Sequence, residues 1–220
     1  MAKRQIVGVV SQKGGVGKST LCQLIAREAS LAGKQAKILD LDTKQMTSVD
    51  WVRARLERDL TPAVAAEPTK DIGKSLKHSR DYDLIVLDGA PGTPKRTAEL
   101  VSECDLVVLP TGASRADLVP TLALARNLAN GKGRRARPVF ALCRVMTESE
   151  AASARAAIGE AGFEILDGEL IERPGYRQAQ NLGRSATETA YASLNDKARQ
   201  LARSILDRLA WDAIAVGGPR

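Results

Sequence analysis

Hydrophobic and polar residues alternate along the chain in blocks that predict its elements. Apolar residues follow one another in five short runs, at 6–10, 36–42, 83–89, 105–110 and 138–145, with weaker runs at 63–67 and 162–170. Runs of this kind, without polar residues at every second position, are typical of strands buried on both faces. The pattern therefore predicts a doubly wound α/β domain, with a mostly parallel sheet and helices on both faces.

The segments between these runs carry apolar residues three or four positions apart, as amphipathic helices do. We expect helices at 19–32, 46–58, 115–130, 148–161 and 187–209. The last has an apolar stripe made of Tyr191, Leu194, Ala198, Leu201, Ile205 and Leu209. We expect one domain over 1–210 and a frayed tail over 211–220.

A glycine-rich segment, SQKGGVGKST at 11–20, joins the first strand to the first helix. A phosphate-binding loop needs glycines to turn backbone N–H groups inward and a helix N-terminus that faces the anion. It also needs a lysine for the β- and γ-phosphates and a hydroxyl for Mg²⁺, here Lys18 and Ser19. The segment predicts a P-loop ATPase that binds ATP and Mg²⁺ through Gly14, Gly15, Val16, Gly17, Lys18, Ser19 and Thr20. The alternative is a glycine turn without a ligand.

The loop departs from the common pattern, because Gln12 stands at its first glycine position and Lys13 precedes the paired glycines. In this it resembles the deviant phosphate loop of the ParA/MinD family of ATPases. Four later segments, at 39–45, 82–92, 104–118 and 173–188, also resemble family segments in the same order. In the first of them Thr43 and Lys44 replace the proline that the family carries.

The resemblance implies roles for several residues. Lys13 would reach across a nucleotide-sandwich homodimer to the partner's phosphates, although it could also be a surface charge, and Lys18 would act within its own subunit. Asp42 would orient the attacking water, and Asp40 would support the magnesium shell or the phosphate loop. These two roles could be reversed if the extended backbone breaks at Leu41.

Asp88 ends an apolar run at the sheet edge where ligands of open α/β folds bind. It would reach Mg²⁺ through a water molecule, or it could simply cap the strand end. Arg144 follows a later strand, where relatives carry a residue near the adenine. A surface ion pair is an equally good interpretation of Arg144.

Composition adds limits to this interpretation. The 220 residues include 33 Lys and Arg against 26 Asp and Glu, and only 3% aromatic residues. The three cysteines have no metal-binding spacing, so we expect buried apolar residues and not an iron-protein type of chemistry. His78, the single histidine, is expected at the surface. No run is long enough to span a bilayer, and we expect a cytoplasmic protein.

The excess positive charge raises the question of a polyanionic partner. Basic residues lie in the loop at 131–137 and along the last helix, where Lys197, Arg199, Arg203 and Arg208 are candidates for DNA contacts. A solvated basic face is the alternative. The segment 204–216 is a weaker candidate for membrane binding, because Asp207 and Asp212 would oppose anionic lipid.

The resemblance thus implies a small ParA-type partition ATPase. Its ATP-bound homodimer would bind non-specific DNA on the nucleoid, and a ParB-like adaptor would stimulate hydrolysis to move a plasmid, a chromosome region or a protein cargo. The alternative is a MinD-like positioning ATPase that associates with a membrane.

Overall fold

The parallel strand pattern is confirmed by a computed structural model that describes residues 3–90, 94–130 and 136–209. Its seven strands form one sheet in the order β3-β2-β4-β1-β5-β6-β7, and all neighbouring strands are parallel. The strands are β1 (Gln5–Val9), β2 (Ala36–Asp40), β3 (Ala65–Pro68), β4 (Leu84–Asp88), β5 (Leu106–Thr111), β6 (Pro138–Val145) and β7 (Glu164–Ile171). The helices are α1 (Lys18–Leu31), α2 (Thr47–Leu56), α3 (Ile72–His78), α4 (Pro94–Ser102), α5 (Arg115–Asn130), α6 (Glu148–Glu160), α7 (Pro174–Asn181) and α8 (Ala192–Leu206).

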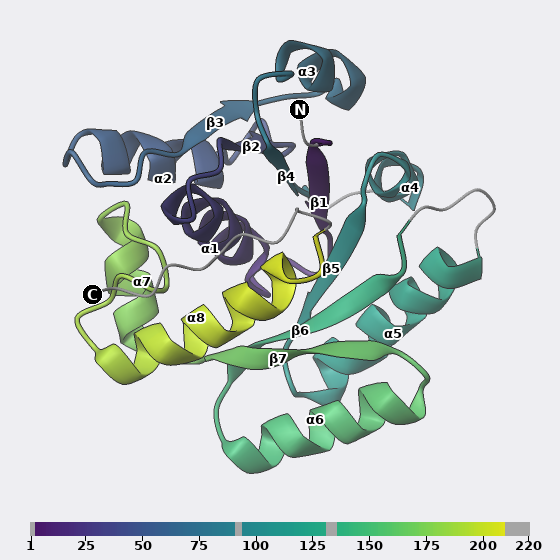
Figure 1. Cartoon of the computed structure of the whole chain (residues 1–220). Helices are drawn as coiled ribbons and strands as arrows, with labels where there is room; N and C mark the ends of the chain where they lie inside the picture. Colours follow the sequence, from purple (N-terminus) through teal and green to yellow (C-terminus); the bar gives the residue numbers. More distant parts are fainter. Residues whose placement is uncertain (1–2, 91–93, 131–135, 210–220) are drawn as a thin grey trace.

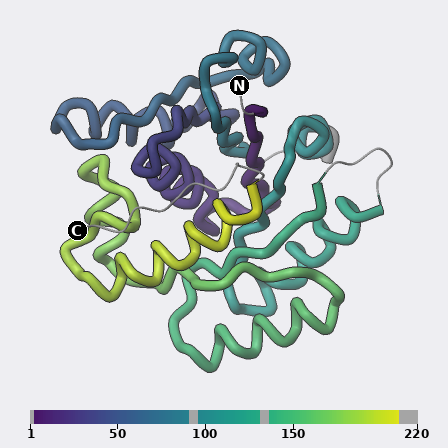
Figure 2. The backbone as a smooth tube through the Cα atoms, in the orientation of Figure 1, coloured from purple at the N-terminus to yellow at the C-terminus, as the bar shows by residue number. Residues whose placement is uncertain are grey.

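Helices cover both faces of this sheet, as the apolar runs predict (Figure 1). One buried cluster joins the sheet to α1, α2, α7 and α8, and a second joins the opposite face to α3, α4, α5 and α6. Every residue of β1, β2, β4 and β5 is buried. The backbone trace follows these two layers around the twisted sheet (Figure 2). The order of the strands places the ends of β1, β2 and β4 side by side at one edge, where the site lies.

The helix predicted over 187–209 is wrong at its first turn, because α8 begins at Ala192. Thr189 accepts the backbone N–H of Tyr191 at 3.1 Å and donates to Asn195 at 2.7 Å, and these side-chain bonds hold the chain in a turn. Tyr191 is therefore 55% exposed and not part of the apolar stripe. The short helices α3, α4 and α7 were not predicted. All three cysteines are buried, as expected, and His78 is exposed.

A buried ion-pair network fastens α2 to the segment after α7. The guanidinium of Arg55, 1% exposed, donates to both carboxylate oxygens of Glu188 at 2.8 and 3.1 Å. It also donates to the carbonyls of Pro62 at 2.9 Å and Gly183 at 3.0 Å. Gly183 has a φ of +71°, and a Cβ there would lie 2.4 Å from the backbone nitrogen of Arg55. The contact thus needs both a glycine and an arginine.

We expect Arg55→Ala to lower the free energy of unfolding by about 3 kcal/mol, because the partly buried Glu188 then keeps only the longer ion pair to Arg27 at 3.3 Å and the N–H of Ser185 at 2.7 Å. Arg53→Ala on the same helix is the matched control. Arg53 pairs with Asp50 at an exposed position, so its loss should cost less than about 1 kcal/mol. Urea denaturation measures both values, and equal losses would show that the buried network is not a fastening point.

Candidate nucleotide-binding site

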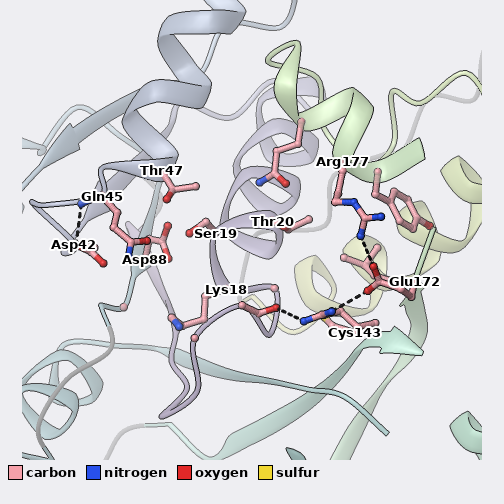
Figure 3. Close-up of a pocket in the computed structure, with 18 of the residues that line it drawn as sticks. Lys18, Ser19, Thr20, Asp42, Gln45, Thr47, Asp88, Cys143, Glu172 and Arg177 are labelled. Atoms are coloured by element: carbon pink, nitrogen blue, oxygen red, sulfur yellow. Dashed lines mark hydrogen bonds and ion pairs between the residues drawn. The ribbon is translucent and has the colours of Figure 1, made fainter. Parts of the chain in front are cut away.

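A cavity of about 530 Å³ opens at the carboxyl edge of the sheet. It lies within the size range of small-molecule sites. The phosphate loop, the carboxyl ends of β2, β4 and β6, and the end of β7 together with α7 supply its walls. Figure 3 shows Asp42, Gln45, Thr47 and Asp88 at one end and Glu172 and Arg177 at the other. Residues from five parts of the chain therefore meet around one space.

The phosphate loop turns where its glycines allow it. Gly15 has a φ of +70° and Gly17 a φ of +105°, a region that favours glycine, and Gly17 precedes the first residue of α1. A Cβ on Gly17 would also lie 3.3 Å from the Cβ of Cys143. The loop thus brings the N-terminus of α1 to the cavity, as the sequence predicts.

Lys18 carries a buried positive charge in this loop. Lys18 is only 8% exposed, and its ammonium donates to the carbonyl of Lys13 at 3.0 Å. Within the described residues Lys18 forms no ion pair. Burial lowers the pKa of Lys18, while the nearby charge of Asp88 opposes this shift. A buried cation with only a carbonyl partner is suited to a bound anion.

Asp88 carries the corresponding buried negative charge. It is 3% exposed and accepts hydrogen bonds from the hydroxyls of Ser48, at 2.7 Å, and Ser19. Burial raises the pKa of Asp88 to about 6, although both hydroxyl bonds act in the opposite direction. No ion pair to Asp88 exists in the part of the chain that the structure describes. A carboxylate beside a hydroxyl is the ligand type that Mg²⁺ prefers.

Asp40 lies next to Asp88, because β2 and β4 pair these two residues in register. Burial raises the pKa of Asp40. Strand β2 ends at Asp40, so the extended backbone does not continue to Asp42 as predicted. One carboxylate oxygen of Asp40 accepts the N–H of Asp42 at 3.0 Å, and the other accepts the N–H of Ser48 at 2.9 Å. Asp40 thus holds the segment that carries Asp42.

Asp42 lies nearer the surface of the cavity and lines it. Its carboxylate accepts the N–H groups of Lys44 at 3.2 Å and Gln45 at 3.1 Å, which folds residues 42–46 into a turn. Ser48 follows at the start of α2, is fully buried, and connects this turn to both Asp40 and Asp88. The sequence analysis did not name Ser48 as a site residue. The one feature that could have indicated it is the position of a hydroxyl side chain eight residues after Asp40, the acidic end of the strand.

Lys13 is paired within its own chain. Its ammonium lies 2.6 Å from a carboxylate oxygen of Asp117 in the first turn of α5. Ser114 donates to the other oxygen at 2.6 Å, and these bonds lower the pKa of Asp117 below its usual range despite some burial. Asp117 was not among the predicted site residues, because nothing local in the sequence relates it to Lys13.

Arg144 forms the surface ion pair that one of its two interpretations predicted, yet it also lines the cavity. Its guanidinium donates to Glu172 at 2.8 Å and to the carbonyl of Gly15 at 3.0 Å. The bond to Glu172 raises the pKa of Arg144 and lowers that of Glu172. Glu172 also accepts from Arg177 of α7 at 2.5 Å. This cluster connects the phosphate loop to the wall formed after β7.

The basic residues predicted to contact DNA lie on α8 and at its end, away from the cavity lining. Lys197 pairs with Glu169 at 3.2 Å and Arg199 with Asp196 at 2.6 Å. Arg208 pairs with Glu164. Arg203 has no ion pair among the described residues. Residues 131–135 of the predicted basic loop lie outside the described residues. So do residues 210–216 of the segment that was a weaker candidate for membrane binding.

The structure fits a nucleotide with its metal better than a metal alone. Among residues 3–90, 94–130 and 136–209, no three His, Cys, Asp or Glu side chains converge as a metal site. Mg²⁺ in nucleotide sites usually takes one or two carboxylates from the protein and its other ligands from water and the phosphates of the nucleotide. Ser19 and Asp88 fit this pattern, because they supply one hydroxyl and one carboxylate and leave the remaining ligand positions to the phosphates. In the same residues no helix is long and apolar enough to cross a membrane.

Comparisons with known proteins agree with this geometry. The family model described as the CobQ/CobB/MinD/ParA nucleotide binding domain matches residues 7–210. Protein ParA of Rhizobium radiobacter is 26% identical over 184 residues, covering 78% of this chain and 80% of that protein. MinD of Aquifex aeolicus has a TM-score of 0.73 at 19% identity, covering 92% and 97%. MinD of Pyrococcus horikoshii, complexed with Mg-ADP, has a TM-score of 0.67 at 18% identity, covering 92% and 96%.

The pKa of Asp88 predicts how stability depends on pH without nucleotide and magnesium. An unfolded aspartate releases its proton near pH 4, whereas Asp88 in the folded protein has a pKa of about 6. The free energy of unfolding of the wild type therefore falls as the pH rises from about 4 to about 6. Asp88→Asn does not titrate. We expect the variant to gain stability relative to the wild type over this interval, reaching a difference of about 2–3 kcal/mol at pH values above 7.

Urea denaturation in EDTA at pH 4.5 and 8 measures this difference. Asp81→Asn is the control, because Asp81 is exposed and should give the same small change at both pH values. A destabilised Asp88→Asn at pH 8 would contradict the predicted cost of the buried charge.

Proposed function

The chain belongs to the CobQ/CobB/MinD/ParA nucleotide-binding family, and on this premise we propose that it is a ParA-like partition ATPase. The observation that carries the proposal is the pair of buried, oppositely charged groups at the cavity, Lys18 and Asp88, neither of which has an ion-pair partner in the described residues. Magnesium supplies the missing partner of Asp88, and the phosphates of a nucleoside triphosphate supply that of Lys18. The likeness to a ParA protein over most of the chain favours partition among the functions of the family.

The phosphate loop binds ATP through the backbone of Gly14, Gly15 and Gly17, with Val16 and Thr20 completing the turn and the helix start. Lys18 holds the β- and γ-phosphates. Ser19 and Asp88 hold Mg²⁺, and Asp40 supports them by fixing the neighbouring segment. The bound metal neutralises phosphate charge during phosphoryl transfer. Arg144 lies where it can contact the nucleotide beside Gly15.

Asp42 orients the attacking water, since it lies at the magnesium end of the cavity and is less buried than Asp40 and Asp88. Positive charge around the departing γ-phosphoryl accelerates its transfer. Lys18 supplies one such charge, and Lys13 of a second subunit supplies another when ATP holds two copies together. Because Lys13 is paired with Asp117 in the single chain, that pair breaks as the dimer forms.

The ATP-bound homodimer binds non-specific DNA on the nucleoid in the cytoplasm, and a ParB-like adaptor stimulates hydrolysis to release it. Positive net charge favours a polyanionic track. A MinD-like positioning ATPase is the second candidate, supported by the likeness in fold to MinD proteins. Nucleotide-dependent binding to vesicles and not to DNA would identify that candidate.

The water-orienting role predicts a trapped dimer. Light scattering should show the wild type as a dimer with ATP and Mg²⁺ and as a monomer with ADP. Asp42→Ala should bind ATP normally and remain dimeric. It should hydrolyse ATP at least about 100-fold more slowly than the wild type. Asp42→Asn is the matched control for the turn, because an amide oxygen still accepts the N–H groups of Lys44 and Gln45, and it should be equally slow.

A persistent wild-type monomer at saturating ATP would overturn the sandwich dimer and the transport cycle with it. Normal hydrolysis by Asp42→Ala would move the water-orienting role elsewhere, with Asp40 the first residue to test.

The pair between Lys13 and Asp117 predicts a second effect. Asp117→Asn removes the competing carboxylate, so the ATP-dependent dimer should form about two- to five-fold more tightly, the value of a partly exposed ion pair. Sedimentation at several protein concentrations measures this affinity. Asp105→Asn, which removes the surface pair with Lys3, should leave it unchanged. A weaker dimer for Asp117→Asn would mean that Asp117 assists Lys13 in the complex.

A further inference from the structure

Helix α3 and its flanks present a second group of basic side chains, which we call the basic face of α3. It consists of Lys70, Lys74, Lys77 and Arg80, all exposed. Lys74 and Lys77 are three positions apart on the helix and so share one side of it. Lys70 and Arg80 lie just outside the helix, one on either flank. The four cations thus lie within eleven residues of the chain.

These cations have no ion-pair partner among the described residues. The acidic residues around them are otherwise engaged. Glu67 pairs with Lys37 at 2.8 Å, Asp71 accepts the N–H of Lys74 as the N-cap of α3, and Asp83 accepts the N–H of Gln35 at 2.8 Å. The carboxylates of Asp71 and Asp81 are both exposed within or beside this segment and offset part of its charge. The basic face of α3 therefore leaves its ammonium groups free for an external anion.

The basic residues of α8 differ in this respect. Lys197, Arg199 and Arg208 each have a carboxylate partner within the chain. Contacts between these three and phosphates would have to compete with existing ion pairs, and only Arg203 is without one in the described residues. Figure 1 shows α3 and α8 in separate parts of the molecule. The sequence analysis named α8 and the loop at 131–137 as basic segments and did not name residues 70–80.

The core holds α3 in place through its other side. Leu76 and Ser75 are buried, and the guanidinium of Arg4 donates to the carbonyls of Leu76 at 2.7 Å and Ser79 at 3.1 Å at the end of the helix. The lysines take no part in these contacts, so folding does not require them. Like charges so close together repel one another and cost stability unless an anion is present.

The chemistry of this face selects one class of partner. A helix that lies on a membrane surface needs exposed apolar side chains beside its charges. Residues 70–80 contain no exposed large apolar residue, and the apolar side of α3 faces the core. A face that offers cations alone fits a polyanion recognised through its phosphates.

We infer that the basic face of α3 contacts the backbone phosphates of non-specific double-stranded DNA. The inference rests on the proposed function, because it assigns the surface by which the ATP-bound dimer holds its track. Lys70, Lys74 and Lys77 each neutralise a phosphate and release its counterions, which makes binding independent of sequence and sensitive to salt.

The test compares two triple variants of the full chain that lose the same charge. The first is Lys70→Gln/Lys74→Gln/Lys77→Gln, and the control is Lys197→Gln/Arg199→Gln/Arg203→Gln on α8. Fluorescence anisotropy with a labelled 24-base-pair duplex of random sequence measures Kd in ATP and Mg²⁺ from about 50 to 200 mM salt. Melting temperature and light scattering in ATP confirm that each variant folds and forms the dimer.

We expect the α3 variant to bind at least about tenfold more weakly, with a log Kd against log salt slope smaller by about 2–3, and the α8 variant to stay within about threefold of the wild type. A wild-type affinity and slope for the α3 variant would overturn this inference and leave the proposed function standing. No DNA binding by the wild type would overturn both. Binding of the wild type to phosphatidylglycerol vesicles, lost in the α3 variant, would replace DNA by a membrane.

Discussion

The arrangement of the site depends on two desolvated charges of opposite sign, Lys18 and Asp88, held near each other but not joined in an ion pair. Each opposes the pKa shift that burial causes in the other, which lets both remain inside the protein. An ion pair between them would satisfy both groups and leave no charge for a ligand. Hydroxyl groups of Ser19 and Ser48 satisfy Asp88 instead, and a carbonyl satisfies Lys18. The site is thus stable enough to fold, yet it gains from binding a cation and a polyanion together.

The sheet and the phosphate loop were predictable, because their signals are local. Strands β1, β2, β4, β5 and β6 coincide with the five clear apolar runs, whereas β3 and β7 coincide with the two weaker ones. The loop concentrates its glycines, lysine and hydroxyl in ten residues. The short helices α3, α4 and α7 were missed, since seven to nine residues give too few turns for apolar spacing to stand out. The first turn predicted for α8 failed for another reason. The bonds among Thr189, Tyr191 and Asn195 replace helical bonds there, and apolar spacing carries no information about them.

The supporting residues of the site were not predictable, because their contacts are distant in sequence. Asp117 meets Lys13 across 104 positions, and Arg144 meets Gly15 across 129. Ser48 is nearer, but its role follows only from the register that sets Asp40 beside Asp88. The end of β2 at Asp40 also separates two carboxylates that the apolar run at 36–42 predicted to lie in one extended strand. Both carboxylates accept two backbone N–H groups and line the cavity, but Asp40 is 1% exposed whereas Asp42 is only partly buried, and this difference supports assigning them distinct roles.

The same contrast applies to the surface. A count of Lys and Arg along the chain gives equal weight to α3 and α8, but ion pairs within the chain neutralise much of α8 and leave the basic face of α3 unpaired. Neither outer face contributes to the core, so substitutions there change charge without changing the fold. Chains that share this fold at 18–19% identity can therefore keep the same packed layers while differing in the charges on their outer faces. The buried charges of the cavity, Lys18 and Asp88, and the exposed charges of the basic face of α3 belong to separate parts of the molecule, so one set can change without disturbing the other.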